Sequence, residues 1–356
     1  MRLTVRSWHN GNLRVLTITE PRSLWAAVFC GSMESGSGKR LLTPVRFHAG
    51  DIELVHSEPA RNELIRQTLN LNRKIAAIDR LRLTDREFAK HFDGSRLFLY
   101  GDISRCAGEG LEFSHQALEL LRRRIGRQMI AQIDYDQRRL HPNLGAMLDS
   151  IDFQTKHSPS AVATVVCFHT ILQRVGVVPT DVTWMVKGAG AVGGRIVKQV
   201  AATCRGVYVQ ERLEERREAL LSLPNVTVVS GEAISKVRAD AVVFAADSGS
   251  LSLDVAHALA VNGSVAAVGG PEAGLDHNLQ AVQSLTARGK WFVPSVLCGS
   301  LGVVSNLEEC LGIEPNLEVY ARRLESRAAV MADRAVSTGR PFHQLCLDML
   351  EGRPAV

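Results

Sequence analysis

The sequence has no apolar run of the roughly 18–20 residues that a membrane-spanning helix needs, so an integral membrane protein is not expected. Its N-terminal residues alternate apolar and polar side chains and lack the apolar core of a secretory signal, which predicts strands instead. The seven cysteines are scattered, without a CxxC pair or a zinc-like Cys/His spacing. We therefore expect no metal site, and we expect reduced thiols in the cytoplasm.

Neither sign of charge dominates the composition. The chain has 42 Lys and Arg residues against 37 Asp and Glu, a formal net charge of +5. Most arginines lie in mixed-charge helical stretches such as 211–220, where they are expected to face solvent. No zinc-finger pattern or aromatic-interleaved basic stripe accompanies them, so nucleic acid is not an expected partner. At 356 residues and 46% hydrophobic content, the sequence predicts a globular protein of two domains.

A Gly/Ser-rich stretch over 31–39 ends in Gly38-Lys39 and has some likeness to a phosphate-binding loop. That loop requires a glycine five residues before its Gly-Lys pair and a Ser or Thr after it. Met33 and Arg40 occupy these two places. The stretch is therefore expected to be a turn without a bound phosphate.

The residue pattern in the first half of the chain predicts a mixed domain of strands and helices. Residues 1–32 are expected to form short strands with a hairpin turn at Asn10-Gly11-Asn12. Thr84 and Glu87 have the spacing of a capping box, which predicts that a helix begins there. Periodicity predicts the following elements: a helix over 58–80, a helix over 84–92, a buried strand over 95–102 and a long helix over 109–134.

The second half alternates strands with helices. An apolar helix that begins at Ser158 is expected to end at Gly176, with His169 as a core residue. Six strand candidates follow it, at 183–188, 206–211, 226–230, 239–246, 263–270 and 290–296. They are apolar at nearly every position, as strands buried on both faces of a parallel sheet are. Residues 301–356 are expected to be helical.

A glycine turn stands between the first of these strands and the next helix. It reads Gly188-Ala189-Gly190-Ala191-Val192-Gly193, and this context is typical of a dinucleotide-binding Rossmann domain. Gly188 permits a tight turn, Gly190 lets the backbone approach a pyrophosphate, and Gly193 lets the helix pack close to the strand. The N-terminus of the helix would then face the phosphates with its positive end.

The next predicted strand ends at Glu211, about 20 residues past Gly188, where an acidic side chain binds the adenosine ribose hydroxyls. A carboxylate there repels a 2′-phosphate, which favours NAD over NADP. Arg212, next to it, could pair with a 2′-phosphate, so NADP remains possible. Four further residues at predicted strand ends complete the expected cofactor site: Ala245, Ala246, Gly269 and Glu272.

With these residues in place, the chain resembles the Glu/Leu/Phe/Val dehydrogenase family, and most closely its leucine and phenylalanine dehydrogenase branch. The resemblance runs from the Ser158-Pro159-Ser160 helix through the glycine turn to the C-terminal helices. It implies an α/β protein in which a cleft separates an N-terminal substrate and oligomerisation domain from a Rossmann domain. We expect the first domain over 1–155, completed by helices at 305–356, and the second over 156–304. The resemblance also implies a homo-oligomer.

The resemblance implies roles for two residues of the first half. Lys74 resembles the family's lysine that pairs with the substrate carboxylate, and Asp102 resembles its proton-transferring aspartate. Two structural alternatives stay open: Lys74 as a solvated charge on an amphipathic helix, and Asp102 as a helix N-cap.

Other family positions differ in this chain. Leu83-Thr84-Asp85-Arg86 stands where the family has a Gly-Gly-Gly-Lys loop whose lysine activates water, and Lys39 precedes Lys74 and is not assigned that role. Glu272-Ala273 replaces an Asn-Asn pair, Gly299 replaces an Asn, and Ala163 replaces a threonine. We therefore expect an NAD(P)-dependent oxidoreductase of specialised metabolism that acts on a small amine, imine or keto-acid-type, amino-acid-derived substrate, and not by ordinary oxidative deamination. The alternative is a dinucleotide-binding protein without hydride transfer, either regulatory or catalysing a non-redox condensation.

Overall fold

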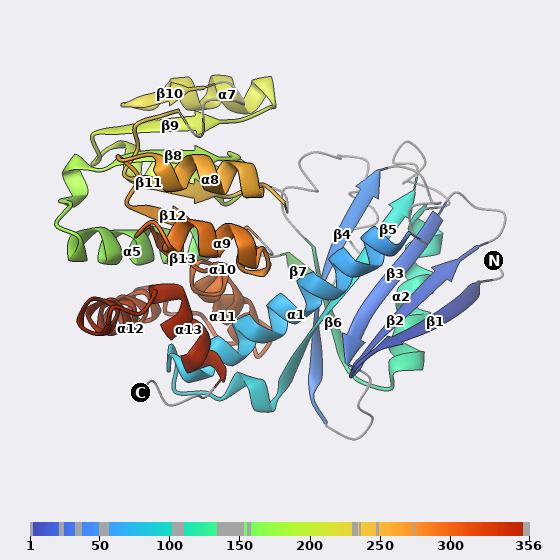
Figure 1. The fold of residues 1–356 in the computed structure, drawn as a ribbon. Coiled ribbons are helices and arrows are strands. Elements are labelled where there is room, and N and C mark those ends of the chain that lie inside the picture. Colours follow the sequence, from blue (N-terminus) through green and yellow to red (C-terminus); the bar gives the residue numbers. More distant parts are fainter. Residues whose placement is uncertain are drawn as a thin grey trace. The chain divides into compact units, whose positions relative to one another are not determined.

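The computed structural model describes residues 3–20, 25–32, 38–49, 57–101, 110–133, 153–154, 158–229, 234, 236–246, 249–272 and 275–351. The chain has an α/β fold and divides into two compact units (Figure 1). The first unit comprises Met1–Ile75 and Glu87–Lys156, and the second comprises Ala76–Arg86 and His157–Val356. Each unit contains its own sheet and its own hydrophobic core.

The first unit contains a seven-stranded sheet in the order β1-β2-β3-β5-β4-β6-β7. Its strands are β1 (Thr4–Asn10), β2 (Leu13–Thr19), β3 (Trp25–Ser32), β4 (Arg40–Ala49), β5 (Phe92–Gly101), β6 (Met129–Ile133) and β7 (Phe153–Gln154). The strands from β1 to β5 in this order pair antiparallel, and those from β5 to β7 pair parallel. The predicted hairpin is confirmed: Asn10 pairs with Leu13, and Gly11 has a φ of +57°.

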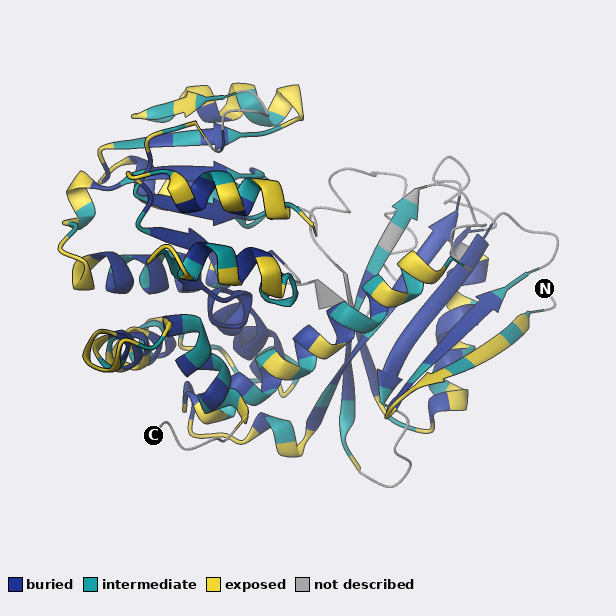
Figure 2. Cartoon of the chain, viewed as in Figure 1, coloured by how far each residue is buried: buried dark blue, intermediate teal, exposed yellow. Residues whose placement is uncertain are grey.

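Two helices cover the two faces of this sheet. The helix α1 (Glu58–Arg80) lies on one face, where Leu64 packs with Val28 and Phe98. The helix α2 (Leu111–Ile125) lies on the other, where its apolar residues pack with Trp25. Alternate residues of β2, β3 and β5 point to opposite faces, so each strand contributes to both cores. This is why these strands are dark blue along most of their length in Figure 2.

Two predicted helices of the first half are wrong in part. The capping-box helix at 84–92 is absent among the described residues there, where only a short 3₁₀ turn at Phe88–Lys90 forms. The Thr84 hydroxyl accepts the Arg86 N–H and so closes a local turn instead. The long helix over 109–134 ends at Ile125, because Gly126 has left-handed backbone angles, and β6 follows.

The second unit contains a six-stranded parallel sheet in the order β10-β9-β8-β11-β12-β13. All six predicted strands are confirmed, as β8 (Thr183–Lys187), β9 (Gly206–Gln210), β10 (Val226–Val228), β11 (Ala241–Phe244), β12 (Ala267–Gly269) and β13 (Trp291–Val293). The chain moves outward from β8 to β10, then returns to the other side of β8 and continues to β13. This 3-2-1-4-5-6 order is that of dinucleotide-binding Rossmann sheets, and the order reverses between β8 and β11.

Helices surround this sheet (Figure 1). The helices of the unit are α5 (Ser158–Arg174), α6 (Gly193–Ala201), α7 (Glu214–Leu221), α8 (Leu253–Val261), α9 (Leu279–Thr286), α10 (Ser295–Cys298), α11 (Ser300–Glu309), α12 (Leu317–Thr338) and α13 (Phe342–Glu351). Of these, α12 lies beyond α5. The three last helices belong to this unit, whereas the sequence assigned 305–356 to the first domain. The reason is that most side chains of α5 are buried, and α11 and α12 pack along this helix.

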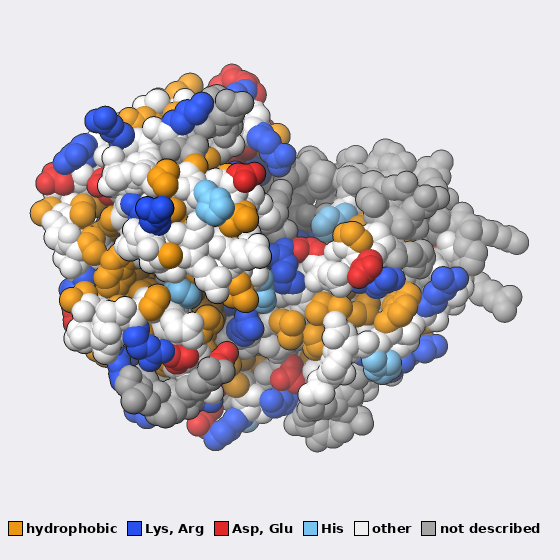
Figure 3. Space-filling view, in the orientation of Figure 1, with side chains coloured by type: hydrophobic (Ala, Val, Ile, Leu, Met, Phe, Trp, Pro, Cys, Tyr) orange, Lys and Arg blue, Asp and Glu red, His pale blue; other side chains and the backbone are white. Residues whose placement is uncertain are grey.

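The surface agrees with the mixed-charge prediction. On the face of the second unit in Figure 3, Lys and Arg side chains lie scattered, with Asp and Glu among them.

The described cysteines at 30, 167, 204, 298, 310 and 346 carry free thiols. No helix in the described part of the chain is long and apolar enough to span a membrane.

Candidate functional site

The glycine turn follows β8 directly and adopts a conformation that only glycine tolerates. Gly188 has a φ of +87°, and a Cβ built on it would lie 2.7 Å from the Cα of Ala246. A Cβ on Gly193 would lie 1.9 Å from the carbonyl oxygen of Gly188. The turn is therefore packed between the start of α6 and the segment after β11, and both glycines are sterically required.

The start of α6 presents backbone N–H groups beside this turn. The N-cap position is occupied by Val192, whose apolar side chain makes no cap hydrogen bond. The first N–H groups of a helix have no acceptor within the helix, so they are suited to binding an anion. In α6 the Gly194 N–H already donates to the Gly190 carbonyl and the Arg195 N–H to the Val192 carbonyl, so the N–H groups that precede Gly194 are the ones suited to an anion. Gly190 and Ala191 are half-buried, and Arg195 Nη1 donates to the Ala191 carbonyl at 2.6 Å. Arg195 was not singled out from the sequence, although it lies in the first turn of the helix that follows the glycine turn.

Glu211 follows β9, and its carboxylate is tied to the glycine turn. One oxygen accepts the Ala189 N–H at 2.7 Å, and the other accepts those of Arg212 and Leu213 at 2.7 and 3.0 Å. The Glu211 side chain is only 7% exposed. The carboxylate therefore fixes the turn as well as standing at the predicted ribose position.

Two arginines lie beside this carboxylate. Arg216 Nη1 is 3.9 Å from Glu211 Oε2, and the Arg216 side chain is largely buried. Arg212 is exposed. Because a nearby cation offsets the negative potential of a carboxylate, Arg216 weakens the repulsion that Glu211 alone would exert on a 2′-phosphate.

The predicted residues at the ends of β11 and β12 meet the same edge of the sheet. The Ala245 N–H donates to the Lys187 carbonyl, and Ala246 packs on Gly188. Gly269 is required by packing, since a Cβ there would lie 2.1 Å from the Val293 carbonyl oxygen. Glu272 is buried, and its Oε1 accepts the Ser250 N–H at 2.8 Å.

Lys187, the last residue of β8, was not singled out from the sequence. Its Nζ donates to the Ser250 carbonyl at 3.1 Å and lies 5.9 Å from the centre of the Phe244 ring. Burial lowers the pKa of Lys187, while the negative charge of Glu272 acts to raise it. Lys187 and Glu272 thus hold the two backbone groups of one residue, Ser250.

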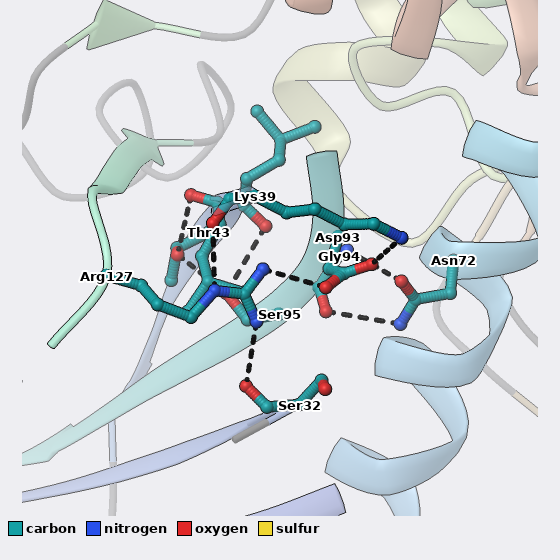
Figure 4. A network of polar contacts seen from close by, with 10 residues as sticks. Ser32, Lys39, Thr43, Asn72, Asp93, Gly94, Ser95 and Arg127 are labelled. Atoms are coloured by element: carbon teal, nitrogen blue, oxygen red, sulfur yellow. Dashed lines mark hydrogen bonds and ion pairs between the residues drawn. The ribbon is translucent and has the colours of Figure 1, made fainter. Parts of the chain in front are cut away.

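Of the two predicted catalytic residues, the structure describes Lys74 only. Lys74 lies on α1, two residues after Asn72, whose side chain bonds both backbone groups of Gly94 near the start of β5 (Figure 4). From Gly94 to its end at Gly101, β5 extends about 23 Å at a rise of ~3.3 Å per residue. Asp102 follows Gly101 and lies outside the described residues. Lys74 is therefore at the end of β5 opposite to the residue that precedes Asp102.

The segment in place of the family's Gly-Gly-Gly-Lys loop is bonded to the C-terminal helices. Arg86 Nη1 lies 2.8 Å from Oε1 of Glu308, a carboxylate with a fully buried side chain on α11. The other oxygen of Glu308 accepts the Tyr320 hydroxyl. Arg323 pairs with Asp85 at 3.0 Å. Arg86 thus has a structural partner within the second unit.

Lys39, at the end of the Gly/Ser-rich stretch, belongs to a polar network at the start of β4 and β5 (Figure 4). Its Nζ lies 3.4 Å from Asp93, which also pairs with Arg127 at 2.7 Å. The Arg127 guanidinium donates further to the carbonyls of Ser32 and Lys39. The Arg127 side chain is 5% exposed, and its contacts join the end of β3 at Ser32 to Lys39 before β4 and to Asp93 of β5.

No family model and no curated protein sequence matches this chain. Solved structures do match its fold, over nearly the whole chain. L-tryptophan dehydrogenase from Nostoc punctiforme has a TM-score of 0.64 at 12% identity, covering 98% of this chain and 96% of that one. The hetero-hexameric glutamate dehydrogenase from Thermus thermophilus has a TM-score of 0.65 at 16% identity, covering 99% and 88%. Glutamate dehydrogenase from Peptoniphilus asaccharolyticus has 0.58 at 15% identity, covering 98% and 88%. The chain thus has the fold of amino-acid dehydrogenases.

Proposed function

We propose that the second unit binds NAD and that the chain is an NAD-dependent oxidoreductase. The observation that carries this proposal is the glycine turn at Gly188–Gly193, which lies where the strand order of the sheet reverses. Open parallel sheets bind dinucleotides at this place. The turn, the start of α6 and Arg195 would hold the pyrophosphate, and Glu211 would accept hydrogen bonds from the adenosine ribose. A bound nicotinamide dinucleotide would supply the hydride donor or acceptor.

NAD is favoured over NADP because Glu211 carries its charge at the ribose position. Its carboxylate is fixed by three backbone N–H groups and so cannot turn away from a 2′-phosphate. Arg216 offsets part of this charge, so NADP should bind weakly rather than not at all. Comparison of the two affinities by calorimetry tests this preference.

For the substrate we propose a small amine, imine or keto-acid-type compound derived from an amino acid. The likeness of fold to tryptophan and glutamate dehydrogenases supports this class. The bonding of Arg86 to Glu308 supports a reaction other than ordinary oxidative deamination, because the segment at 83–86 supplies no lysine. Asp102 remains the proposed proton-transferring group. Lys74 lies at the other end of β5 from Gly101, the residue before Asp102, and this location does not favour Lys74 as the residue that pairs with the substrate carboxylate.

The test begins with cofactor binding. Gly193→Ala should abolish binding of NADH, because the added Cβ meets the Gly188 carbonyl oxygen at the turn. Gly263→Ala is the matched control, since a Cβ there would meet nothing within 4 Å. The wild type is then assayed with a panel of amino and keto acids by the NADH absorbance band. Failure of the wild type to bind NAD(H) or NADP(H) would refute the proposed cofactor.

A second candidate is a protein that binds the dinucleotide without hydride transfer, in regulation or in a non-redox condensation. The observation that favours it is the location of Lys74 at the opposite end of β5 from Gly101. In that case the wild type binds NADH normally but shows no absorbance change with any substrate. Mass spectrometry of the products from paired amino-acid-derived substrates would detect a condensation.

We also propose a homo-oligomer in the cytoplasm. The hexameric state of the Thermus thermophilus enzyme supports assembly, and the free thiols of the described cysteines support a reducing compartment. Light scattering after size-exclusion chromatography measures the mass directly. A monomer at all concentrations would contradict the proposed assembly.

A further inference from the structure

Two oppositely charged side chains converge on Ser250 at the carboxyl edge of the second unit's sheet. Lys187 reaches it from the end of β8 and donates to its carbonyl at 3.1 Å. Glu272 reaches it from the segment after β12 and accepts its N–H at 2.8 Å. Ser250 itself follows β11. Three strands on both sides of the point of strand-order reversal are therefore joined through a single residue.

These contacts hold Ser250 firmly. Hydrogen bonds to charged groups are about twice as strong as those between neutral groups. The Glu272 residue is 3% exposed, so its carboxylate is stable there only with partners such as the Ser250 N–H and the nearby charge of Lys187. Ser250 cannot shift without breaking a bond to one of the two charges. Closing the turn between β11 and α8 would not by itself require a buried carboxylate.

The position of Ser250 indicates which half of the cofactor it would face. In a Rossmann sheet each half binds one mononucleotide, and Glu211 lies in the half formed by β8, β9 and β10. Ser250 and Glu272 follow strands of the other half, which faces the nicotinamide. We propose that Lys187 and Glu272 are positioning residues that fix the Ser250 segment as a wall of the nicotinamide site. This inference rests on the proposed NAD site.

The test compares two ligands that differ only in the nicotinamide half. NADH contains the nicotinamide ring, whereas ADP-ribose contains the adenosine, the pyrophosphate and the second ribose without that ring. The variants are Lys187→Met, Glu272→Gln and the double variant, which leaves no buried charge without its opposite. Each affinity is measured by calorimetry on the full chain, alongside a thermal melt.

Lys290→Met is the matched control. Lys290 Nζ also donates to backbone carbonyls, those of Asn262 and Val265 at 2.7 Å each, and burial lowers its pKa as it lowers that of Lys187. These carbonyls lie before β12, at the amino edge of the sheet. The control therefore removes the same kind of contact far from the proposed ligand.

We expect NADH affinity to fall about tenfold in each single variant, the effect of losing one charge-assisted hydrogen bond, and at least as much in the double variant, which loses two. ADP-ribose affinity should stay unchanged, and Lys290→Met should bind both ligands as the wild type does. Equal losses for both ligands, no loss, or the same loss in Lys290→Met would overturn the inference while leaving the NAD site in place. A wild type that binds neither ligand would instead refute the proposed function.

Discussion

Replacement of Glu211 by glutamine should destabilise the second unit, because this side chain fixes the glycine turn. The substitution keeps the size and shape of the side chain but turns one carboxylate oxygen into an NH₂ group. The native oxygens accept three backbone N–H groups, one of them from Ala189 in the turn. An NH₂ group accepts none, so at least one buried donor loses its partner.

The magnitude follows from these contacts. The best orientation of the glutamine keeps its carbonyl oxygen on the Arg212 and Leu213 amides and leaves the Ala189 N–H facing a donor. An unsatisfied buried donor costs about 1–3 kcal/mol, and the two remaining bonds lose their charge assistance. We therefore expect the free energy of unfolding to fall by about 2–3 kcal/mol.

Urea denaturation followed by circular dichroism measures this change, provided that the slope of the transition is the same in both proteins. Glu214→Gln is the matched control. Glu214 is also a carboxylate of this region, but its side chain is 67% exposed and it pairs with Arg217 on the surface. Such a pair contributes about 0–1 kcal/mol. If the two variants unfold at the same urea concentration, the structural role of Glu211 is refuted, whatever the cofactor.

Three further predictions concern Gly188, Arg86 and His169. Gly188→Ala should lower the free energy of unfolding in urea by about 1–3 kcal/mol more than Gly249→Ala does. Both glycines have positive φ, but only at Gly188 does the added Cβ meet backbone atoms, so equal losses would contradict this packing. Arg86→Met should lower the unfolding free energy by about 2–3 kcal/mol by leaving the buried Glu308 carboxylate without its cation, and an accompanying Glu308→Gln should recover part of the loss. Burial lowers the pKa of His169 below 6.5, so the unfolded chain binds protons that the folded chain does not, and stability is lost as pH falls below that value. His169→Gln should flatten this loss in melts between about pH 7 and about pH 5, and an unchanged slope would show that His169 does not contribute.

The glycine turn and the strands around it could be predicted because their signals are local. A buried parallel strand needs apolar residues at every position, and a turn with positive φ needs glycine, so both appear in a few consecutive residues. The helix predicted at 84–92 failed for the opposite reason. Thr84 has the residues of a capping box around it, but its hydroxyl closes a two-residue turn and Phe92 is already in β5.

The contacts that give the candidate site its properties are not local. Lys187, Ser250 and Glu272 meet only because parallel strands bring their carboxyl ends to one edge, and no spacing in the sequence indicates which strands are neighbours. The pairing of Arg86 with Glu308 likewise joins residues far apart in the chain. A family resemblance could suggest that the segment at 83–86 had changed, but not what Arg86 does there.

By itself the sequence determined the alternation of strands and helices, the position of the glycine turn and the acidic residue after the second strand. These depend on backbone angles and on burial along single elements. Only the tertiary structure decided the strand order and the grouping of the C-terminal helices with the second unit. It also decided that Lys74, on α1, lies beside the end of β5 opposite to Gly101. The physical reason is that these features depend on which apolar faces cover one another, and that choice is made by the packing of the whole unit.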